Sequence, residues 1–141
     1  MANISSELRD EVLKSSDHQC EYCRTPERYS GIPLEVDHII PQSVGGLTEA
    51  DNLCSACRTC NNAKRTAQTG IDPETDGEVS LFNPRTEKWS EHFAWSKDNP
   101  ATITGLTATG RATIQRLRMN NKIIVIARSA WRKAGWTPPT D

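Results

Sequence analysis

The sequence has no long apolar run and no strong excess of either charge. No stretch approaches the roughly 20 consecutive apolar residues that a transmembrane helix needs. The N-terminal segment MANISSELRD lacks the basic-then-apolar pattern of a secretory signal. Hydrophobic residues make up 35% of the chain and charged residues 25%, the balance of a soluble globular protein on the polar side. We therefore expect a cytoplasmic protein without membrane contacts, whose five cysteines are reduced thiols or metal ligands.

The net charge of -1 hides an uneven distribution of charge along the chain. Residues 105–140 contain no Asp or Glu, whereas several acidic residues gather in residues 72–78. The basic residues of the acid-free segment are Arg111, Arg116, Arg118, Lys122, Arg128, Arg132 and Lys133. Such asymmetry indicates either a cationic surface for a polyanion or solvated helix faces, and charge alone does not separate the two.

The length of 141 residues and the local patterns predict one α+β domain over residues 1–141. Strands are expected over residues 34–40, 53–56, 79–82, 89–95 and 102–106. Helices are expected from Ser5 or Ser6, over residues 61–68 with Gly70 as a stop, over 107–119 and over 122–135. Residues 27–33 are predicted to form a turn, and Pro138-Pro139 a frayed tail. The first half therefore predicts a ββα unit of about forty residues, a length at which a metal commonly substitutes for a core.

The cysteine spacing predicts that metal. Cys20 and Cys23 form a C-x-x-C pair without the βαβ setting of a redox motif. Cys54, Cys57 and Cys60 form two overlapping C-x-x-C pairs, and spacing alone does not choose between them. Two such knuckles predict one tetrahedral zinc with four thiolates, which leaves no open position for water. The zinc is therefore expected to be structural, and any chemistry must occur elsewhere.

A second group of residues has the composition of a hydrolytic site. Asp37 and His38 are adjacent near the end of the first predicted strand, and Asn61 lies on the following helix. A histidine titrates in the range needed for a general base, and carboxylate and amide oxygens suit a hard divalent cation. Because neighbouring strand residues point to opposite faces, Asp37 and His38 serve one site only if the strand twists or bulges.

The whole stretch VDHIIPQSVGGLTEADNLCSACRTCNNAK resembles the ββα-metal finger of HNH endonucleases. The resemblance implies a finger core over about residues 18–70, with zinc held by Cys20, Cys23, Cys57 and Cys60. Cys54 would be a small buried strand residue. It also implies His38 as general base, Mg²⁺ or Mn²⁺ held by Asp37 and Asn61, and Asn52 orienting the base by fastening the loop. Asn61 stands where the name has its last histidine, which makes this an H-N-N variant. The segments FNPRTEKWSEHFAW and GLTATGRATIQRLRMN resemble the C-terminal extension, over about residues 78–136, of small bacterial HNH proteins.

The activity implied by this resemblance is metal-dependent hydrolysis of DNA, with a nick as the elementary product. Contacts would go mostly to the DNA backbone with little sequence reading. The residues expected to contact phosphates are Arg58, Lys64, Arg65 and Arg111. The alternative is a non-catalytic zinc-binding module for nucleic acid or protein that keeps the shape with a degenerate nuclease site. A third reading is a structural subunit whose catalytic partner is another chain.

Overall fold

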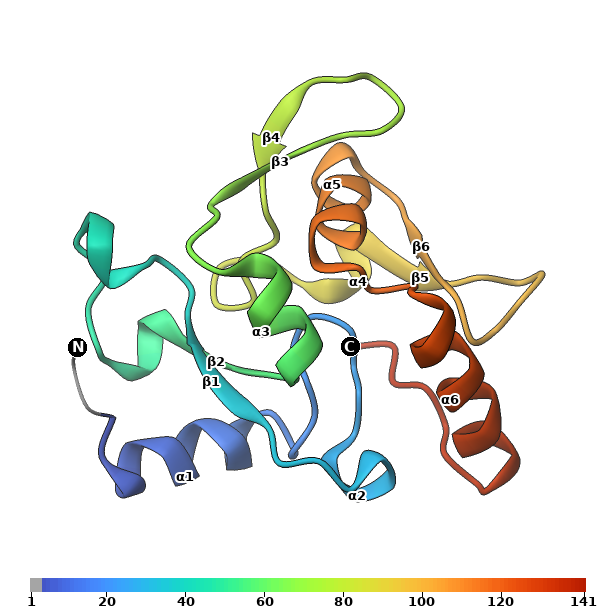
Figure 1. Cartoon of the computed structure of the whole chain (residues 1–141), viewed down its shortest axis with the longest axis horizontal. Helices are drawn as coiled ribbons and strands as arrows, with labels where there is room; N and C mark the ends of the chain where they lie inside the picture. Colours follow the sequence, from blue (N-terminus) through green and yellow to red (C-terminus); the bar gives the residue numbers. More distant parts are fainter. Residues whose placement is uncertain (1–3) are drawn as a thin grey trace.

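Two short strands and the helix that follows them form the centre of the fold. The computed structural model describes residues 4–141, and in it β1 (Glu35–His38) pairs antiparallel with β2 (Leu53–Ala56). The helix α3 (Arg58–Lys64) starts directly afterwards, because the Cys57 sulfur accepts a hydrogen bond from the Cys60 amide and so caps the helix. The predicted ββα unit within an α+β fold is thus confirmed (Figure 1).

The long connection between β1 and β2 is held in a compact form. It contains two short 3-10 turns, Gln42–Val44 and Ala50–Asn52. Gly46 is required here, because a Cβ at this position would collide with the carbonyl oxygen of Ile40. Asn52 fastens the two ends: its Nδ2 donates to the carbonyls of Ile40 and Leu47, and its Oδ1 accepts from the Ile40 amide.

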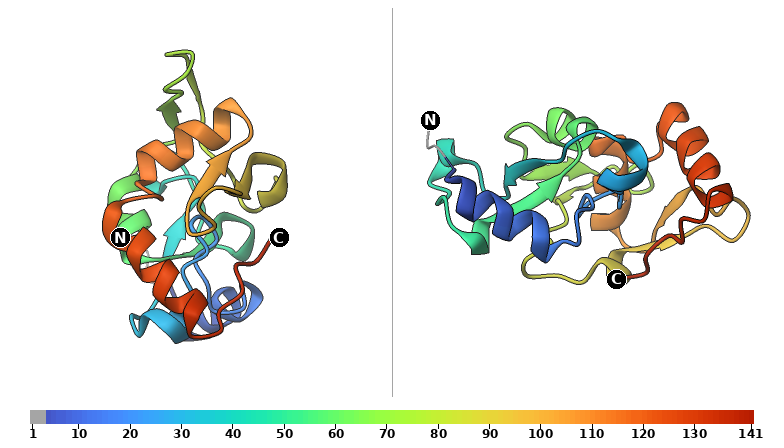
Figure 2. Two further views of the ribbon diagram at one scale, coloured as in Figure 1. Left: turned by 90° about the vertical axis from the view of Figure 1, so that its right-hand side faces the viewer. Right: turned by 90° about the horizontal axis from the view of Figure 1, so that it is seen from below.

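The N-terminal segment packs against this hairpin. The helix α1 (Ser6–Ser15) is capped by Ser5, one of the two serines that the sequence offers, and buries Val12 against β2. The predicted turn at residues 27–33 instead contains a short helix, α2 (Glu27–Ser30), which ends at Gly31 with a left-handed φ of 70°. α1 and α6 (Lys122–Lys133) lie at opposite ends of the molecule (Figures 1 and 2).

The C-terminal half adds two hairpins and two longer helices. Its elements are β3 (Thr69–Ile71), β4 (Glu78–Ser80), α4 (Trp89–His92), β5 (Phe93–Trp95), β6 (Ile103–Gly105), α5 (Ala108–Leu117) and α6. β3 pairs with β4 and β5 with β6, both antiparallel. α5 contacts α3, β3 and β6, so it connects the finger to both hairpins.

Three sequence expectations are wrong in this region. The finger helix was expected over residues 61–68 but runs from Arg58 to Lys64. It ends there because Arg65 leaves the helical region with a φ of 52°. Gly70 lies in β3 instead of stopping the helix. Residues 89–92 form α4 where a strand was expected, with the Trp89 indole donating to the carbonyl of Tyr22. The tail is not frayed, because the Pro139 carbonyl accepts a hydrogen bond from the Trp95 indole.

The two halves share one hydrophobic cluster. Cysteines of the finger, Tyr22 and Leu34 pack together with Phe82, Trp89 and Leu117 of the C-terminal half. Within residues 4–141, none of the helices combines the length and the apolar character needed to cross a bilayer.

Candidate metal centre and active site

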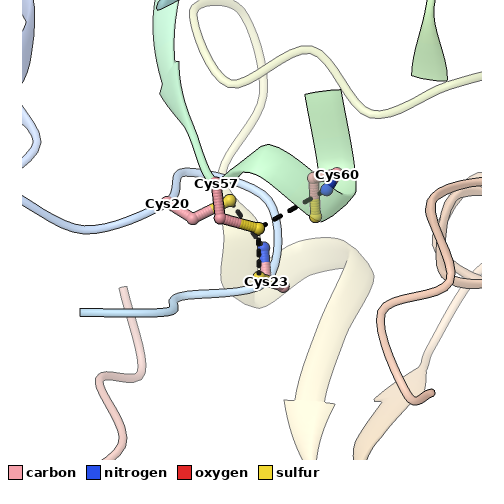
Figure 3. Close-up of side chains that lie close together, drawn as sticks. All are labelled: Cys20, Cys23, Cys57 and Cys60. Carbon is pink, nitrogen blue, oxygen red and sulfur yellow. Dashed lines mark hydrogen bonds between the residues drawn. The ribbon is translucent and has the colours of Figure 1, made fainter. Parts of the chain in front are cut away.

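Four of the five cysteines converge on one point. The sulfur atoms of Cys20, Cys23, Cys57 and Cys60 all lie within 4.8 Å of one another (Figure 3). A tetrahedral zinc with Zn–S bonds near 2.3 Å places its sulfurs about 3.8 Å apart, so the cluster matches a four-thiolate site. The first pair comes from the loop after α1, and the second from the start of α3. The chain thus has a four-cysteine cluster positioned to bind a metal and compatible with zinc.

The backbone around each pair has the form of a metal knuckle. The amide of Cys23 donates to the sulfur of Cys20, and the amide of Cys60 donates to the sulfur of Cys57, both at 3.4 Å. Such N–H···S bonds orient the ligand sulfurs and favour their thiolate form. Cys20, Cys23 and Cys60 are at most 2% exposed, whereas Cys57 is partly exposed.

Two buried arginines lie beside the cluster. Arg128 of α6 is fully buried and donates to the carbonyls of Ala101 and Met119, at 3.0 and 2.6 Å, and to that of Cys23 at 3.5 Å. The guanidinium of Arg24 stacks over the Trp89 ring, 4.9 Å from its centroid. Four thiolates around one divalent zinc carry a net negative charge. These guanidinium groups therefore suit the site electrostatically, and Arg128 also joins the first knuckle to the C-terminal half.

Cys54 stands apart from the cluster. It is fully buried in β2, and its sulfur lies 3.4 Å from the hydroxyl of Tyr22. Burial raises the pKa of the Cys54 thiol well above its usual value, and the charge of Asp37 adds to the rise. A neutral thiol in this position has the properties of a small apolar residue.

Asp37 lies on the face of β1 that is turned toward α3. Its carboxylate is 5% exposed, and Oδ2 accepts a hydrogen bond from the Tyr22 hydroxyl at 2.8 Å and pairs with Lys64 Nζ at 3.0 Å. Burial is the main cause of a raised pKa at Tyr22, and the charges of Cys54 and Asp37 raise this pKa further. The Tyr22 hydroxyl therefore stays protonated and donates to Asp37. Lys64 also donates to the carbonyls of His38 and Ile39. The ammonium thus neutralises Asp37 and holds the end of β1.

His38 points away from Asp37, toward the loop. The register of β1 with β2 is regular from Glu35 to His38, so the expected bulge is not found within the strand. His38 Nε2 lies 2.9 Å from the Thr48 hydroxyl, and the side-chain amide of Gln42 donates to the same hydroxyl at 3.4 Å. Thr48 therefore fixes the ring of His38 within the loop that Asn52 fastens.

Asn61 faces β1 from the first turn of α3. Its Nδ2 donates to Glu35 Oε1 at 2.8 Å, and Glu35 Oε2 pairs with Arg58 Nε at 3.5 Å. Because a carboxylate only accepts hydrogen bonds here, the amide nitrogen must face Glu35 and Oδ1 must point elsewhere. No hydrogen bond or ion pair in the described part of the chain uses Oδ1 of Asn61 or Oδ1 of Asp37. The only fully buried side-chain nitrogen or oxygen atoms without a hydrogen-bond partner in the described residues are Nε of Arg24 and Nε of Arg128. Oδ1 of Asp37 and Oδ1 of Asn61 are therefore accessible to solvent.

The structure places the predicted catalytic residues on β1 and on the facing helix α3 without joining them directly. Asp37 bonds to Tyr22 and Lys64, His38 to Thr48, and Asn61 to Glu35. The sequence reasoning missed Glu35, Thr48 and Tyr22 as partners of these residues. The alternation of strand residues is the one signal that places Glu35 and Asp37 on one face.

The four basic residues expected to contact phosphates have different surroundings. Lys64 is 2% exposed and forms an ion pair with Asp37. Its side chain does not reach the surface, contrary to the expectation of a phosphate contact. Arg111 pairs with Asp72 and Glu74, so its guanidinium is already engaged. Arg58 is exposed but pairs with Glu35, whereas Arg65 is exposed without an ion pair in the part of the chain that the structure describes.

These features define a ββα finger with a four-cysteine metal centre and a separate polar site at the end of its first strand. The family model of HNH endonuclease matches residues 20–66, the segment that contains both sites. Residues 20–66, about a third of the chain, are therefore similar to HNH endonucleases, and this similarity indicates a nuclease that acts on nucleic acid. The comparisons with curated proteins and with solved structures gave no match.

Proposed function

We propose that the protein is a metal-dependent endonuclease that hydrolyses phosphodiester bonds in DNA. The observation that carries this proposal is the pair of oxygens without a partner, Asp37 Oδ1 on β1 and Asn61 Oδ1 on the facing helix α3, with His38 next to Asp37 in the strand. A carboxylate oxygen and an amide oxygen are suitable ligands for a hard divalent cation that keeps several waters. Both residues therefore qualify as ligands of Mg²⁺ or Mn²⁺.

The divalent ion, when bound, supplies positive charge for the scissile phosphate and its leaving oxygen. Glu35 holds the amide of Asn61 so that its oxygen is presented, and Tyr22 and Lys64 hold the carboxylate of Asp37 by the other oxygen. Lys64 is therefore a residue that positions Asp37 in this proposal, in place of the phosphate contact first expected from it.

His38 is the general base in this proposal. If the Thr48 hydroxyl accepts from Nε2–H of His38, Nδ1 carries the lone pair and takes a proton from the attacking water. Asn52 acts indirectly, because it fastens the loop that carries Thr48 and makes no hydrogen bond to the His38 ring.

The elementary product is a nick, because one finger carries one such site and cuts one strand per encounter. Contacts go mainly to phosphates, with little reading of the base sequence. Supercoiled plasmid should therefore give nicked circles before linear DNA. Equal amounts of nicked and linear product from a monomer would contradict this step.

The decisive experiment is plasmid cleavage with Mg²⁺ or Mn²⁺ by the wild type and by His38→Ala. General-base catalysis contributes about 10²–10⁴-fold, so the variant should lose at least 100-fold in rate. His18→Ala is the matched control, because the His18 side chain is 53% exposed and pairs with Glu27, away from Asp37 and His38 in the sequence. All three proteins should retain one equivalent of zinc. Cleavage by His38→Ala at the wild-type rate would overturn the assignment.

One observation favours a second candidate function. Asp37 already has a positive partner in Lys64, and a site that binds no cation would be stable in this form. The alternative is a non-catalytic zinc-binding module that binds nucleic acid or protein. A wild type that binds DNA but does not cleave it with either cation would favour this reading.

A further inference from the structure

A groove between α3 and α5 contains three arginines. It has a volume of about 490 Å³ and is lined by Thr59, Asn62, Ala63, Arg65, Arg116 and Arg118. No acidic residue lines it. Arg65, Arg116 and Arg118 are all exposed, and the first directly follows α3 while the other two lie at the end of α5.

The three guanidinium groups have no partner of their own within residues 4–141. None makes an ion pair, a side-chain hydrogen bond or a stacking contact with an aromatic ring, whereas Arg58, Arg85 and Arg111 each pair with a carboxylate. In the same part of the chain, Arg132 of α6 is the one other arginine without any such partner. Three of the four free guanidinium groups thus share one groove.

Helix ends explain part of this arrangement but not all of it. Basic side chains near a helix C-terminus are favoured by the helix dipole, and Arg116 and Arg118 have this position in α5. The dipole effect is small for exposed residues, and it does not require two helices to direct three cations into one groove. Like charges in one concavity repel each other, and a bound polyanion removes that cost.

We propose that this groove binds the phosphate backbone of the DNA substrate and guides one strand to the finger. This inference rests on the proposed function. Arginine, threonine and asparagine side chains are common donors to phosphate oxygens, and such contacts position a duplex without reading its sequence. Arg116 and Arg118 belong to the basic, acid-free segment of the sequence, but the sequence does not place them beside Arg65.

The helix α3 connects the groove to the candidate active site. Asn61 and Lys64 face β1, whereas Thr59, Asn62 and Arg65 face the groove. An α-helix with its side chains is about 10–12 Å wide. Phosphates of a duplex are about 3.4 Å apart along its axis on each strand. A strand that crosses α3 therefore reaches from the groove to Asn61 within about three nucleotides.

The test compares two double variants with the same loss of charge. Arg116→Gln with Arg118→Gln removes two cations from the groove, and Arg132→Gln with Lys133→Gln removes two from α6. Binding of a fluorescent 20-base-pair duplex is measured between 50 and 200 mM salt without added divalent ions. Each phosphate contact contributes about 0.9 to the slope of log K against log salt, so the groove variant should lose about 1.8 of the slope. The α6 variant should keep the wild-type slope. Zinc content and circular dichroism verify that both variants fold.

A groove variant with the wild-type salt slope would overturn the inference even if the wild type cleaves plasmid. With active protein, the groove variant should raise KM at least tenfold and leave kcat within twofold of the wild type. If the wild type binds DNA through the groove but never cleaves it, the proposed function fails and the groove inference stands. Equal loss of slope in both double variants would indicate diffuse attraction by net charge and would also overturn it.

Discussion

The ammonium of Lys64 lies 3.0 Å from Asp37 Oδ2, and both side chains are almost completely buried, at 2% and 5% exposure. Lys64 also donates to the carbonyls of His38 and Ile39, so one cation holds the carboxylate and the end of the strand that carries the candidate base. A buried charge that loses its partner keeps the cost of leaving water without the compensating attraction. This pair therefore makes the finger end stable only when a positive charge faces Asp37.

Replacing Lys64 should destabilise the protein strongly. Lys64→Met leaves the carboxylate of Asp37 unpaired, and breaking a buried pair in this way costs about 3–5 kcal/mol. Urea unfolding of the zinc-loaded protein at pH 7 measures the loss. Arg65→Met, one residue further on and exposed, should change the stability by less than about 0.5 kcal/mol.

The double variant Asp37→Asn with Lys64→Met separates charge from packing. It should be more stable than Lys64→Met alone, because the unpaired charge is removed. Mg²⁺ should stabilise Lys64→Met more than the wild type, since a cation at Asp37 replaces the missing ammonium. A single variant as stable as the wild type would contradict the importance of the pair.

The two kinds of cysteine should differ in their effect on zinc. Cys57→Ser removes one of the four clustered sulfurs and should abolish stoichiometric zinc binding and unfold the finger. Cys54→Ala removes a buried thiol outside the cluster and should keep one zinc per chain with a modest loss of stability. Metal analysis of the purified proteins measures both results. Loss of zinc from Cys54→Ala would show that the ligand set is wrong.

The sequence predicts the local parts of this molecule well. The strand Leu53–Ala56 is found where it was expected, because a short apolar run is bounded by the Asp51-Asn52 turn and the second knuckle. The sequence also predicts a serine cap for α1 at Ser5 or Ser6, and Ser5 provides it. Cysteine spacing left two choices for the second knuckle, and the structure clusters Cys57 and Cys60 with the first pair.

The partners of the polar residues could not be predicted in the same way. Lys64 and Asp37 are 27 residues apart, and helical composition gave no reason to expect a buried lysine. Residues 72–78 contain several acidic residues, and nothing in their spacing indicates that Asp72 is fully buried and binds Arg111. The groove depends on α5 packing against α3, which is a tertiary contact without a local signal.

The pair of Asp72 and Arg111 should produce a pH-dependent contribution to stability. The Arg111 guanidinium holds the pKa of Asp72 well below its usual range, and folding therefore favours the ionised carboxylate. This contribution is fully present above the usual Asp pKa of about 3.9 and is lost as the pH falls through the lower folded value. Asp72→Asn should be less stable than the wild type at pH 7, and the difference should shrink at pH 3. Urea unfolding at both pH values measures it, and a difference independent of pH would contradict the ionic origin.

Glu35 provides the sharpest test of how the amide of Asn61 is used. Its carboxylate accepts from Asn61 Nδ2, and this bond directs Oδ1 away from Glu35. Removing a partner that orients a metal ligand typically costs 10–100-fold in metal affinity or activity. Glu35→Ala should therefore raise the Mg²⁺ concentration for half-maximal plasmid cleavage by about 10–100-fold. Glu35→Gln keeps an oxygen acceptor for the same bond and should recover part of the loss.

The Mg²⁺ titration distinguishes this role from a purely structural one. Glu91→Ala on α4 removes an exposed carboxylate and should leave both the Mg²⁺ midpoint and the maximal rate unchanged. If Glu35→Ala lowers the maximal rate at every Mg²⁺ concentration but leaves the midpoint in place, Glu35 supports the fold alone. A shifted midpoint with a nearly unchanged maximal rate is the result that a ligand held by Glu35 requires, because excess cation compensates for a misdirected amide.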